Sequence, residues 1–331
     1  MSCMLLLGAG FSRNWGGWLA AEAFEYLIGC PEINADPNLS ELLWRNQHTG
    51  GFENALAELQ ALTDRDPAMF DTLQQLRGAV LSMFDVMNGC FQRLVNFEPE
   101  NNNAVRRFLF DFDAIFTLNQ DLLLEYQYLN MHPELLAPQR RQGYALPGMR
   151  PVHDPLQAGA PGGQWSRRWM PANPDQFNVD PELQPYFKLH GSSNWQQDDA
   201  GRTMLIMGGG KAKEIGLVPV LQWYQEKFTE YLCRGDARLM VIGYGFRDEH
   251  INAVIIDAIE NYGLKLFVVS PDGADQARRI APSAGGMIRD KTPLEHAFER
   301  GLVGASRRSI PEIFNGRQAI ELSKLLRFVQ R

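Results

Sequence analysis

Three short motifs in this 331-residue chain combine residues that could bind an anion and move a proton. "GAGFS" begins at Gly8, "LNQD" contains Asn119 and Asp121, and "HGSSN" begins at His190. Glycines let the backbone approach a ligand closely, and the free N–H groups of a following helix can hold a phosphate or pyrophosphate. A neutral imidazole can accept a proton, while an amide orients the group that gives it up. This chemistry requires that the three motifs, which lie far apart in the sequence, meet at one place in the fold.

Each motif directly follows a short apolar segment that is typical of a buried strand. Longer helical stretches separate these segments, as in a parallel sheet that is covered on both faces. We therefore predict an α/β fold, a Rossmann-like parallel sheet with helices on both faces. The carboxyl ends of such strands border one crevice, the usual ligand site of this architecture. The five predicted strands are "CMLLL" ending at Leu7, "DAIFT" ending at Thr117, "YFKL" ending at Leu189, "RLMVI" ending at Ile242 and "KLFVV" ending at Val269; "GYGFRDEHIN" and "SPDG" follow the last two.

The glycine motifs allow more than one interpretation. Gly8 and Gly10 bracket a turn, but Arg13 stands where the dinucleotide fingerprint GxGxxG has its third glycine. The turn is therefore either an anion site or a purely structural connection. A second glycine-rich stretch, "GGGK" at residues 208–211, is not a nucleotide triphosphate loop, because Ala212 stands where that loop needs serine or threonine.

The polar residues at the other strand ends also have structural alternatives. Asn119 and Asp121 are separated by one residue, so both side chains could face the crevice, but both residue types are common turn caps. His190 is either a catalytic group or a structural histidine at the end of a strand. His250, in "DEHIN", could contact a ligand or cap a helix. The choice depends on whether these residues come together in space.

The spacing of apolar residues divides the chain into a main domain and an insert. Between the first two predicted strands, apolar positions recur every three or four residues over several helices, more than one crossover needs. We assign residues 40–103 to a helical insert, and residues 1–39 and 104–275 to the Rossmann-like domain. Residues 276–331 are expected to be C-terminal surface helices, which either pack on the sheet or form an oligomer interface. Residues 133–185, rich in Pro, Gly, Arg and aromatic residues, are expected to form an ordered cover.

The composition argues against several classes of protein. The formal net charge is −7 and the basic residues are dispersed, so no direct nucleic-acid binding is expected. The four cysteines, at positions 3, 30, 90 and 233, form neither a CxxC pair nor a dense disulfide framework, which fits a reducing compartment. No apolar run is long enough to span a membrane. We therefore expect a cytoplasmic protein without a membrane partner.

Taken together, the five motifs at the strand ends resemble the sirtuin superfamily, and specifically its bacterial sirtuin-like NAD-consuming branch found in antiphage defence systems. "GAGFS" is similar to the family's GAG-x-S dinucleotide loop and "TLNQD" to its T-x-N-x-D segment. "KLHGS" matches the segment with the family's histidine, and "IGYGFRDEHIN" resembles the glycine-rich late segment of the defence branch. "VVSPD" falls where the family contacts the adenosine half of NAD. The order and spacing of the motifs agree from residue 5 to about residue 275.

The resemblance implies roles for individual residues. Asn119, His190 and Asp121 are implied to be catalytic, with Asp121 at the nicotinamide end. No metal is implied: the four-cysteine zinc module of the protein-deacylating sirtuins has no counterpart between residues 194 and 238, where Cys233 is the single cysteine. The residues implied to bind NAD are Gly8, Ala9, Gly10, Phe11, Ser12, Ser192, Gly243, Tyr244, Gly245, Phe246, His250, Ser270 and Asp272.

The resemblance also implies a reaction, the cleavage of NAD+ to nicotinamide and ADP-ribose. The departing ring nitrogen already carries the positive charge, so nicotinamide leaves neutral and no carboxylate pair is needed. The branch implies an NAD-depleting defence effector that is restrained until triggered. We expect a homo-oligomer with a separately encoded partner, such as a HerA-type ATPase or a short Argonaute. The alternatives are a non-catalytic NAD or ADP-ribose binding module and, less favoured because the zinc module is missing, a protein deacylase.

Overall fold

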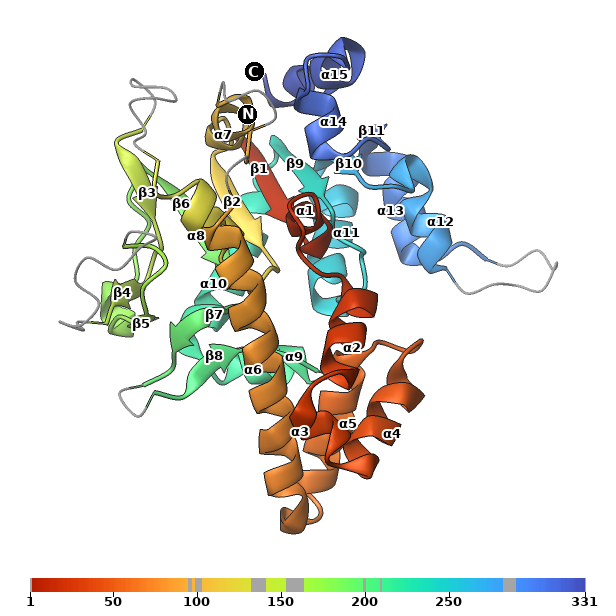
Figure 1. Ribbon diagram of the computed structural model, residues 1–331. Coiled ribbons are helices and arrows are strands. Elements are labelled where there is room, and N and C mark those ends of the chain that lie inside the picture. Colours follow the sequence, from red (N-terminus) through yellow and green to blue (C-terminus); the bar gives the residue numbers. More distant parts are fainter. Residues whose placement is uncertain are drawn as a thin grey trace.

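The fold is described from a computed structural model (Figure 1). Part of the segment 133–185, which we expect to be a cover, lies outside the residues that the structure describes. The described residues are 2–94, 97–98, 103–131, 141–152, 164–198, 201–208, 210–281 and 290–330.

Within these residues, seven strands form one sheet in which every pair of neighbours is parallel. All five strands predicted from the sequence are present, so the prediction of an α/β fold with a parallel sheet is confirmed. In spatial order the strands are β11 (Leu302–Ser306), β10 (Lys265–Val269), β9 (Ala237–Ile242), β1 (Ser2–Leu7), β2 (Ala114–Thr117), β6 (Leu183–Lys188) and β3 (Gly143–Ala145).

The order of the strands places a topological switch point between β1 and β9. From β1 the chain proceeds through β2 to β6 on one side, and later through β9 and β10 to β11 on the other. This is the strand order of doubly wound dinucleotide-binding sheets, in which ligands bind beyond the carboxyl ends of the strands at the switch point. The loops after β1 and β9 therefore border the expected ligand site.

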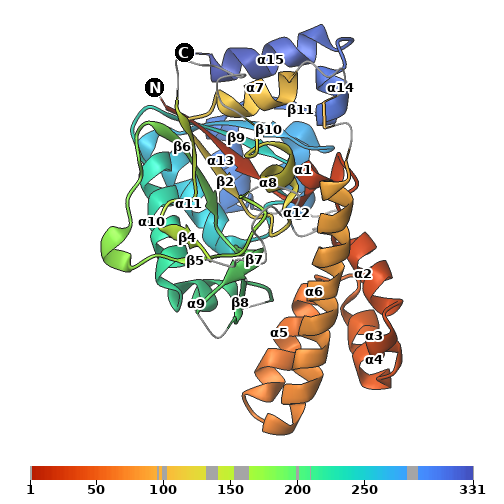
Figure 2. The ribbon, with the colours of Figure 1, turned by 60° about the vertical axis from the view of Figure 1, so that its left-hand side comes forward.

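Helices cover both faces of the sheet (Figures 1 and 2). The ring of Phe116 in β2 stacks on Phe187 of β6, with centroids 4.9 Å apart, and meets Phe228 of α10 edge-on. Burial on both faces explains why the central strands are almost continuously apolar. One face carries α10 (Pro219–Leu232), α11 (Glu249–Tyr262) and α13 (Pro293–Gly301), and the other carries α1 (Ala9–Arg13), α7 (Ala104–Phe110) and α8 (Leu123–Gln127).

The helices between α1 and α7 extend from the end of the sheet at which the strands point (Figure 1). α6 is the longest of them, and α2, α3 and α5 all pack against it. Asn88, near the end of α6, reaches back to the sheet: its side chain accepts from Leu122 N and donates to Ser193 Oγ, both at 2.9 Å. The insert boundaries at 40 and 103 stay a prediction. These helices are α2 (Ala20–Ile28), α3 (Pro31–Asn34), α4 (Pro37–Asn46), α5 (Phe52–Thr63), the 3-10 turn η1 (Pro67–Met69) and α6 (Phe70–Gln92).

A small second sheet lies beside the carboxyl end of β6, where the cover segment was expected. The described part of the segment is anchored to it, because Asn194 donates to the carbonyl oxygens of Trp165 and Arg167 at 3.2 and 2.6 Å. The indole rings of Trp165 and Trp169 stack and are buried. This sheet consists of β4 (Met149–Pro151), β5 (Trp169–Pro171), β7 (Gly191–Gln196) and β8 (Thr203–Leu205), and α9 (Lys211–Gly216) follows it, while the 3-10 turn η4 (Pro174–Gln176) lies between β5 and β6.

The C-terminal region departs from the prediction of helices alone. Leu302–Ser306 forms β11, which pairs with β10 and extends the main sheet. Only one of its residues is buried, so the sequence "LVGAS" lacks the apolar run by which the central strands were recognised. Gly304 is close enough to the ring of Phe267 that a side chain could not fit there. The remaining elements are η5 (Gly273–Asp275), α12 (Gln276–Ile280), α14 (Ile310–Phe314) and α15 (Ala319–Val329).

The turn after β9 provides a test of the fold. Gly243 has a positive φ of 67°, and a Cβ atom there would overlap the backbone of Gly10 and Phe11. We expect Gly243→Ala to lower the free energy of unfolding by at least about 1–2 kcal/mol from the backbone strain alone. In the control, Gly78→Ala on the exposed side of α6, nothing lies within 4 Å and the helix should gain about 1 kcal/mol. Denaturant titration measures both, and a Gly243→Ala variant as stable as the parent would contradict the described contact.

Candidate functional site

The turns after β1 and β9 meet backbone to backbone at the switch point. Gly8 N donates to Ile242 O at 3.0 Å, and Gly10 N donates to Gly243 O at 2.9 Å. A Cβ on Gly8 would lie 2.6 Å from the Cα of Tyr244, and one on Gly10 would lie 2.8 Å from the Cα of Gly243. Both glycines are therefore required for packing, whatever else the turn binds. This supports the structural interpretation of the motif and leaves the anion site as a proposal.

A chain of hydrogen bonds joins the first turn to the end of β2. Asn119 donates through Nδ2 to Gly8 O at 3.1 Å and to Ser12 Oγ at 3.0 Å. Ser12 Oγ in turn donates to Asp121 Oδ2 at 2.8 Å. The carbonyl of Gly8 can only accept, so the amide nitrogen of Asn119 must face it. Both amide protons are then used, and the oxygen Oδ1 is the polar atom that this half-buried side chain can offer to a ligand.

Asp121 lies at the buried end of this chain. Its second oxygen, Oδ1, accepts from Leu123 N at 3.0 Å, so the carboxylate caps the start of α8 as well as holding Ser12. Burial raises the pKa of this carboxyl group, although the nearby charge of Lys188 and the hydrogen bonds from Leu123 and Ser12 oppose the shift. Both oxygens of Asp121 thus have partners within the protein, and one of them holds the hydroxyl group that contacts Asn119, while the predicted role of Asp121 at the nicotinamide end stays a prediction.

A buried ion pair lies directly beneath Asp121. Lys188, in β6, contacts Glu125 Oε1 of α8 at 2.8 Å and donates to Asp121 O at 2.6 Å, and neither of the two charged side chains has any exposed surface. Burial raises the pKa of Glu125, while the ammonium group opposes this shift. The two contacts of Lys188 join β6 to α8 and to the loop after β2. Removing either member of the pair would leave an uncompensated buried charge, so this connection is costly to break.

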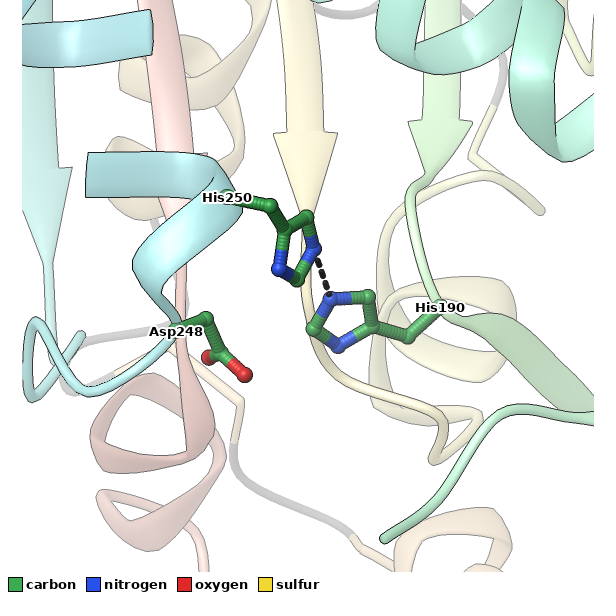
Figure 3. A group of neighbouring side chains, drawn as sticks. All are labelled: His190, Asp248 and His250. Carbon is green, nitrogen blue, oxygen red and sulfur yellow. Dashed lines mark hydrogen bonds between the residues drawn. The ribbon is translucent and has the colours of Figure 1, made fainter. Parts of the chain in front are cut away.

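The imidazole of His190 points toward His250 at the start of α11 (Figure 3). Its Nε2 atom lies 3.1 Å from Nε2 of His250, so one ring donates and the other accepts. His190 is 3% exposed, and the burial lowers its pKa from 6.5 to about 3; Lys211 and His250 act in the same direction and Asp248 opposes them. Burial also lowers the pKa of His250. Both rings are therefore neutral near pH 7.

Asp248 is the anionic group beside the two histidines. Burial alone would raise its pKa, but the histidines and the ammonium group of Lys211 outweigh this and hold the pKa below its usual value. Lys211 lies 2.9 Å from Asp248 Oδ1 and 2.8 Å from Glu53 Oε2, so an ion-pair network connects α5, α9 and α11. His190, Asp248 and His250 can each present one ligand atom within 4.8 Å of the others, a geometry compatible with a metal ion.

Asn119 and His190 follow adjacent parallel strands at the same level. Thr117 pairs with Lys188 in the register of β2 and β6, and each catalytic candidate lies two residues beyond its member of that pair. Gln120, next to Asn119, donates to His190 O at 2.9 Å. The predicted convergence of these two strand ends is thus present.

Most of the other residues implied to bind NAD follow the carboxyl ends of β1, β9 and β10, but several of their side chains already have partners. Tyr244 OH interacts with Asp248 and Asn252, and Ser192 Oγ with Gln120 and Asn194. The rings of Phe11 and Phe246 are buried against other aromatic rings. Ser270 Oγ accepts from Gly273 N, and Asp272 is paired with Arg279. Their predicted contacts with NAD remain predictions.

A comparison of the sequence with models of protein families is consistent with this arrangement of strands and polar residues. Residues 113–285, just over half of the chain, match the model of the SIR2-like domain. The chain belongs to the SIR2-like family. The match includes Asn119, His190 and His250, whereas the turn at Gly8 lies outside it and is joined to it by the hydrogen bonds described above. No curated protein sequence matches this SIR2-like chain.

The family match indicates an NAD-related activity, because SIR2-like domains use NAD+. The fold class and the sirtuin-like resemblance are thereby confirmed at the level of the superfamily. Among the described residues, no helix has the length and apolar character needed to cross a membrane. The cytoplasmic location and the expected partners stay predictions.

Sequence reasoning missed several residues of the SIR2-like site. In the sequence Lys211 stands in a glycine-rich stretch with no sign of a partner, because its contacts with Asp248 and Glu53 depend on helices far apart in the chain. Lys188 could have been found, because a lysine within the buried strand "YFKL" needs a buried counter-charge. No local pattern identifies Glu125 as that counter-charge.

The buried neutral state of His190 predicts a pH dependence of stability. Below pH 6.5 the unfolded chain binds a proton at this imidazole, whereas the folded chain does not until about pH 3. Stability therefore falls as the pH drops, by about 2–3 kcal/mol between pH 7 and 4.5 from this group. The groups facing it are His250, which adds to the fall, Lys211, which stays charged, and Asp248, which titrates below this window.

We expect His190→Gln to flatten this part of the stability curve by about that amount. His296→Gln, at an exposed position on α13, is the matched control and should leave the curve unchanged. Chemical denaturation at several pH values measures the difference. Equal slopes for the His190→Gln variant and the parent chain would show that His190 is not buried in its neutral form.

Proposed function

We propose that this SIR2-like protein is an NAD+ hydrolase that cleaves the bond between nicotinamide and ribose. The observation that supports it most directly is that Asn119, held by the Gly8 turn and Ser12, and the neutral His190 each lie two residues beyond a paired position of adjacent parallel strands. NAD+ would lie across the switch point, with its pyrophosphate at the turn after β1. The family match supports NAD as the substrate.

The charge of NAD+ explains why an amide and an imidazole suffice. Nicotinamide leaves as a neutral molecule, so the site needs no acid to protonate the leaving group, only stabilisation of a cationic ribose and a positioned water. Because both amide protons of Asn119 are used, its Oδ1 atom would accept from the ribose hydroxyl or the attacking water. In this position a lone pair of Asn119 Oδ1 would stabilise the positive charge that develops on the ribose.

His190 would accept the proton that water loses when it bonds to the ribose carbon. A ring whose pKa is about 3 in the folded chain does not hold a proton in the resting state, so it is available as an acceptor. Water becomes strongly acidic only as it bonds to the ribose cation, which suits a weak base acting late in the reaction. The proton can then pass to His250 through the 3.1 Å contact, with Asp248 stabilising the charge.

For the biological role, we propose an NAD-depleting effector of antiphage defence that stays restrained until triggered. Uncontrolled hydrolysis of NAD+ would harm the host, which supports a need for restraint. The helices that bring Asn88 and Glu53 to the edge of the site give a partner or a second subunit a route to it. A homo-oligomer and a HerA-type ATPase or short Argonaute partner are part of this proposal.

Nicotinamide release tests the proposed reaction. The purified chain, alone and with candidate partners, is incubated with NAD+ and the products are separated by chromatography. We expect nicotinamide and ADP-ribose, and we expect Asn119→Ala and His190→Ala each to reduce the rate by about 10²- to 10⁴-fold. His296→Ala, at an exposed position on α13, should match the parent.

The alternatives give different results in the same assay. A non-catalytic binding module would bind NAD+ or ADP-ribose by calorimetry but release no nicotinamide with any partner, and this outcome would reject the hydrolase. A deacylase would need an acylated peptide and would form acyl-ADP-ribose. Retention of full activity by both the Asn119→Ala and His190→Ala variants would remove these two residues from the mechanism.

A further inference from the structure

The side chains of His190, Asp248 and His250 form a cluster between the end of β6 and the start of α11 (Figure 3). We propose that this cluster is a binding site for a zinc-like transition-metal ion, and that the bound ion blocks the histidine that the hydrolase needs. The metal-binding part stands on geometry alone, and the inhibition rests on the proposed function. Two imidazoles and one carboxylate are a donor set typical of zinc, which commonly leaves a fourth position to water.

The distance between the rings fits such an ion. Zn–N bonds of about 2.0–2.1 Å place two ligands of a tetrahedral zinc about 3.3 Å apart. The Nε2 atoms of His190 and His250 are already 3.1 Å apart, so the rings need to separate by only a few tenths of an ångström. The three ligand atoms, one from each side chain, all lie within 4.8 Å of one another. Asp248 therefore needs a change of rotamer to bring its carboxylate oxygen within bonding distance of the ion.

The cluster can bind the ion without a change in its own proton count. The proton between the two Nε2 atoms moves to Nδ1 of the same ring, and both rings stay neutral while each Nε2 lone pair coordinates the metal. Asp248 accepts from Lys211 through Oδ1, which leaves its other oxygen to the ion. His190 is buried, whereas Asp248 and His250 are partly exposed, so the ion can enter from the side of α11.

The surrounding charge sets a limit on affinity. The ammonium group of Lys211 lies 2.9 Å from Asp248 Oδ1 and repels a divalent cation. Glu53, 2.8 Å from Lys211, offsets part of this charge. We therefore expect a reversible site that fills and empties with metal supply rather than a permanent structural centre. Imidazole ligands favour Zn²⁺ over Mg²⁺, which prefers oxygen.

The inhibition follows from the proton balance of the ring. With a metal on Nε2 and the ring proton moved to Nδ1, His190 has no lone pair left to accept a proton and cannot pass one to His250. It also adds positive charge where the reaction develops a ribose cation. A zinc ion at this site would therefore suppress nicotinamide release while leaving the fold intact.

Metal binding is tested first without NAD+. Zn²⁺ is titrated against a chromophoric chelator with the full chain carrying Cys90→Ser and Cys233→Ser, because accessible thiols would bind zinc themselves. We expect one ion per chain, no competition from millimolar Mg²⁺, and at least about tenfold weaker binding for His250→Ala and for Asp248→Asn. His48→Ala, exposed and outside the cluster, should bind as the parent does.

Parent-like zinc affinity in both the His250→Ala and Asp248→Asn variants would overturn the site. X-ray absorption of the zinc-loaded chain gives a measurement that does not depend on any variant. Two imidazole ligands with oxygen support the proposal, and a shell without a pair of imidazoles overturns it.

Inhibition is then measured as nicotinamide release with zinc and after addition of a chelator. We expect loss and recovery of activity in the parent, because the ion leaves His190 when it is chelated. An active chain that binds zinc with two imidazoles yet keeps its rate would reject the inhibition alone. A chain without hydrolase activity would reject the proposed function, while the zinc titration would still decide the metal site.

Discussion

The contact between two glycine-containing turns is the constraint on which the rest of the site depends. Gly8 and Gly10 lie against Gly243 and Tyr244 so closely that no Cβ fits at either position. This contact brings the ends of β1 and β9 together at the switch point and presents Gly8 O to Asn119. The amide of Asn119, the hydroxyl of Ser12 and the carboxylate of Asp121 then follow in one hydrogen-bonded chain. A glycine motif that is typical of phosphate binding thus has a packing function that exists without any ligand.

The site also depends on charges that are costly to bury. Lys188 and Glu125 have no exposed surface, and their pairing offsets a desolvation penalty of several kcal/mol per ion. A hydrophobic pair could replace them in a site that needed only stability. Here the ammonium group also donates to the carbonyl of Asp121, so the pair fixes the loop that carries Asn119. At the neighbouring strand end, the neutral burial of His190 lowers stability only as the pH falls below 6.5, where the unfolded chain binds a proton that the folded chain excludes.

The sequence predicts the central sheet well because β1, β2, β9 and β10 are buried on both faces and mostly apolar, while β6 keeps the aromatic pair Tyr186 and Phe187 beside the buried Lys188. The edge strands were missed: β3 has three residues and β11 has a single buried one, so neither has a recognisable period. Within the site, Asn119, Asp121 and His190 could be predicted because they follow those apolar segments directly. Lys211 and Glu53 could not, since their contacts with Asp248 depend on how α5 and α9 pack, and that arrangement has no signature in a local pattern.

The helical segment links the two halves of the site mechanically. Asn88 of α6 joins the loop after β2 to strand β7, and β7 begins at the residue after His190. Glu53 of α5 pairs with Lys211, which also pairs with Asp248 beside His190 and His250. A displacement of α5 and α6 together would therefore change the environment of Asn119 and of the histidine pair at once. A binding event on these helices would reach both regions without touching NAD+, because Asn88 contacts Leu122 in the loop that carries Asn119, and Lys211 joins Glu53 to Asp248. Such a displacement would alter the surroundings of Asn119 and His190 without changing either residue.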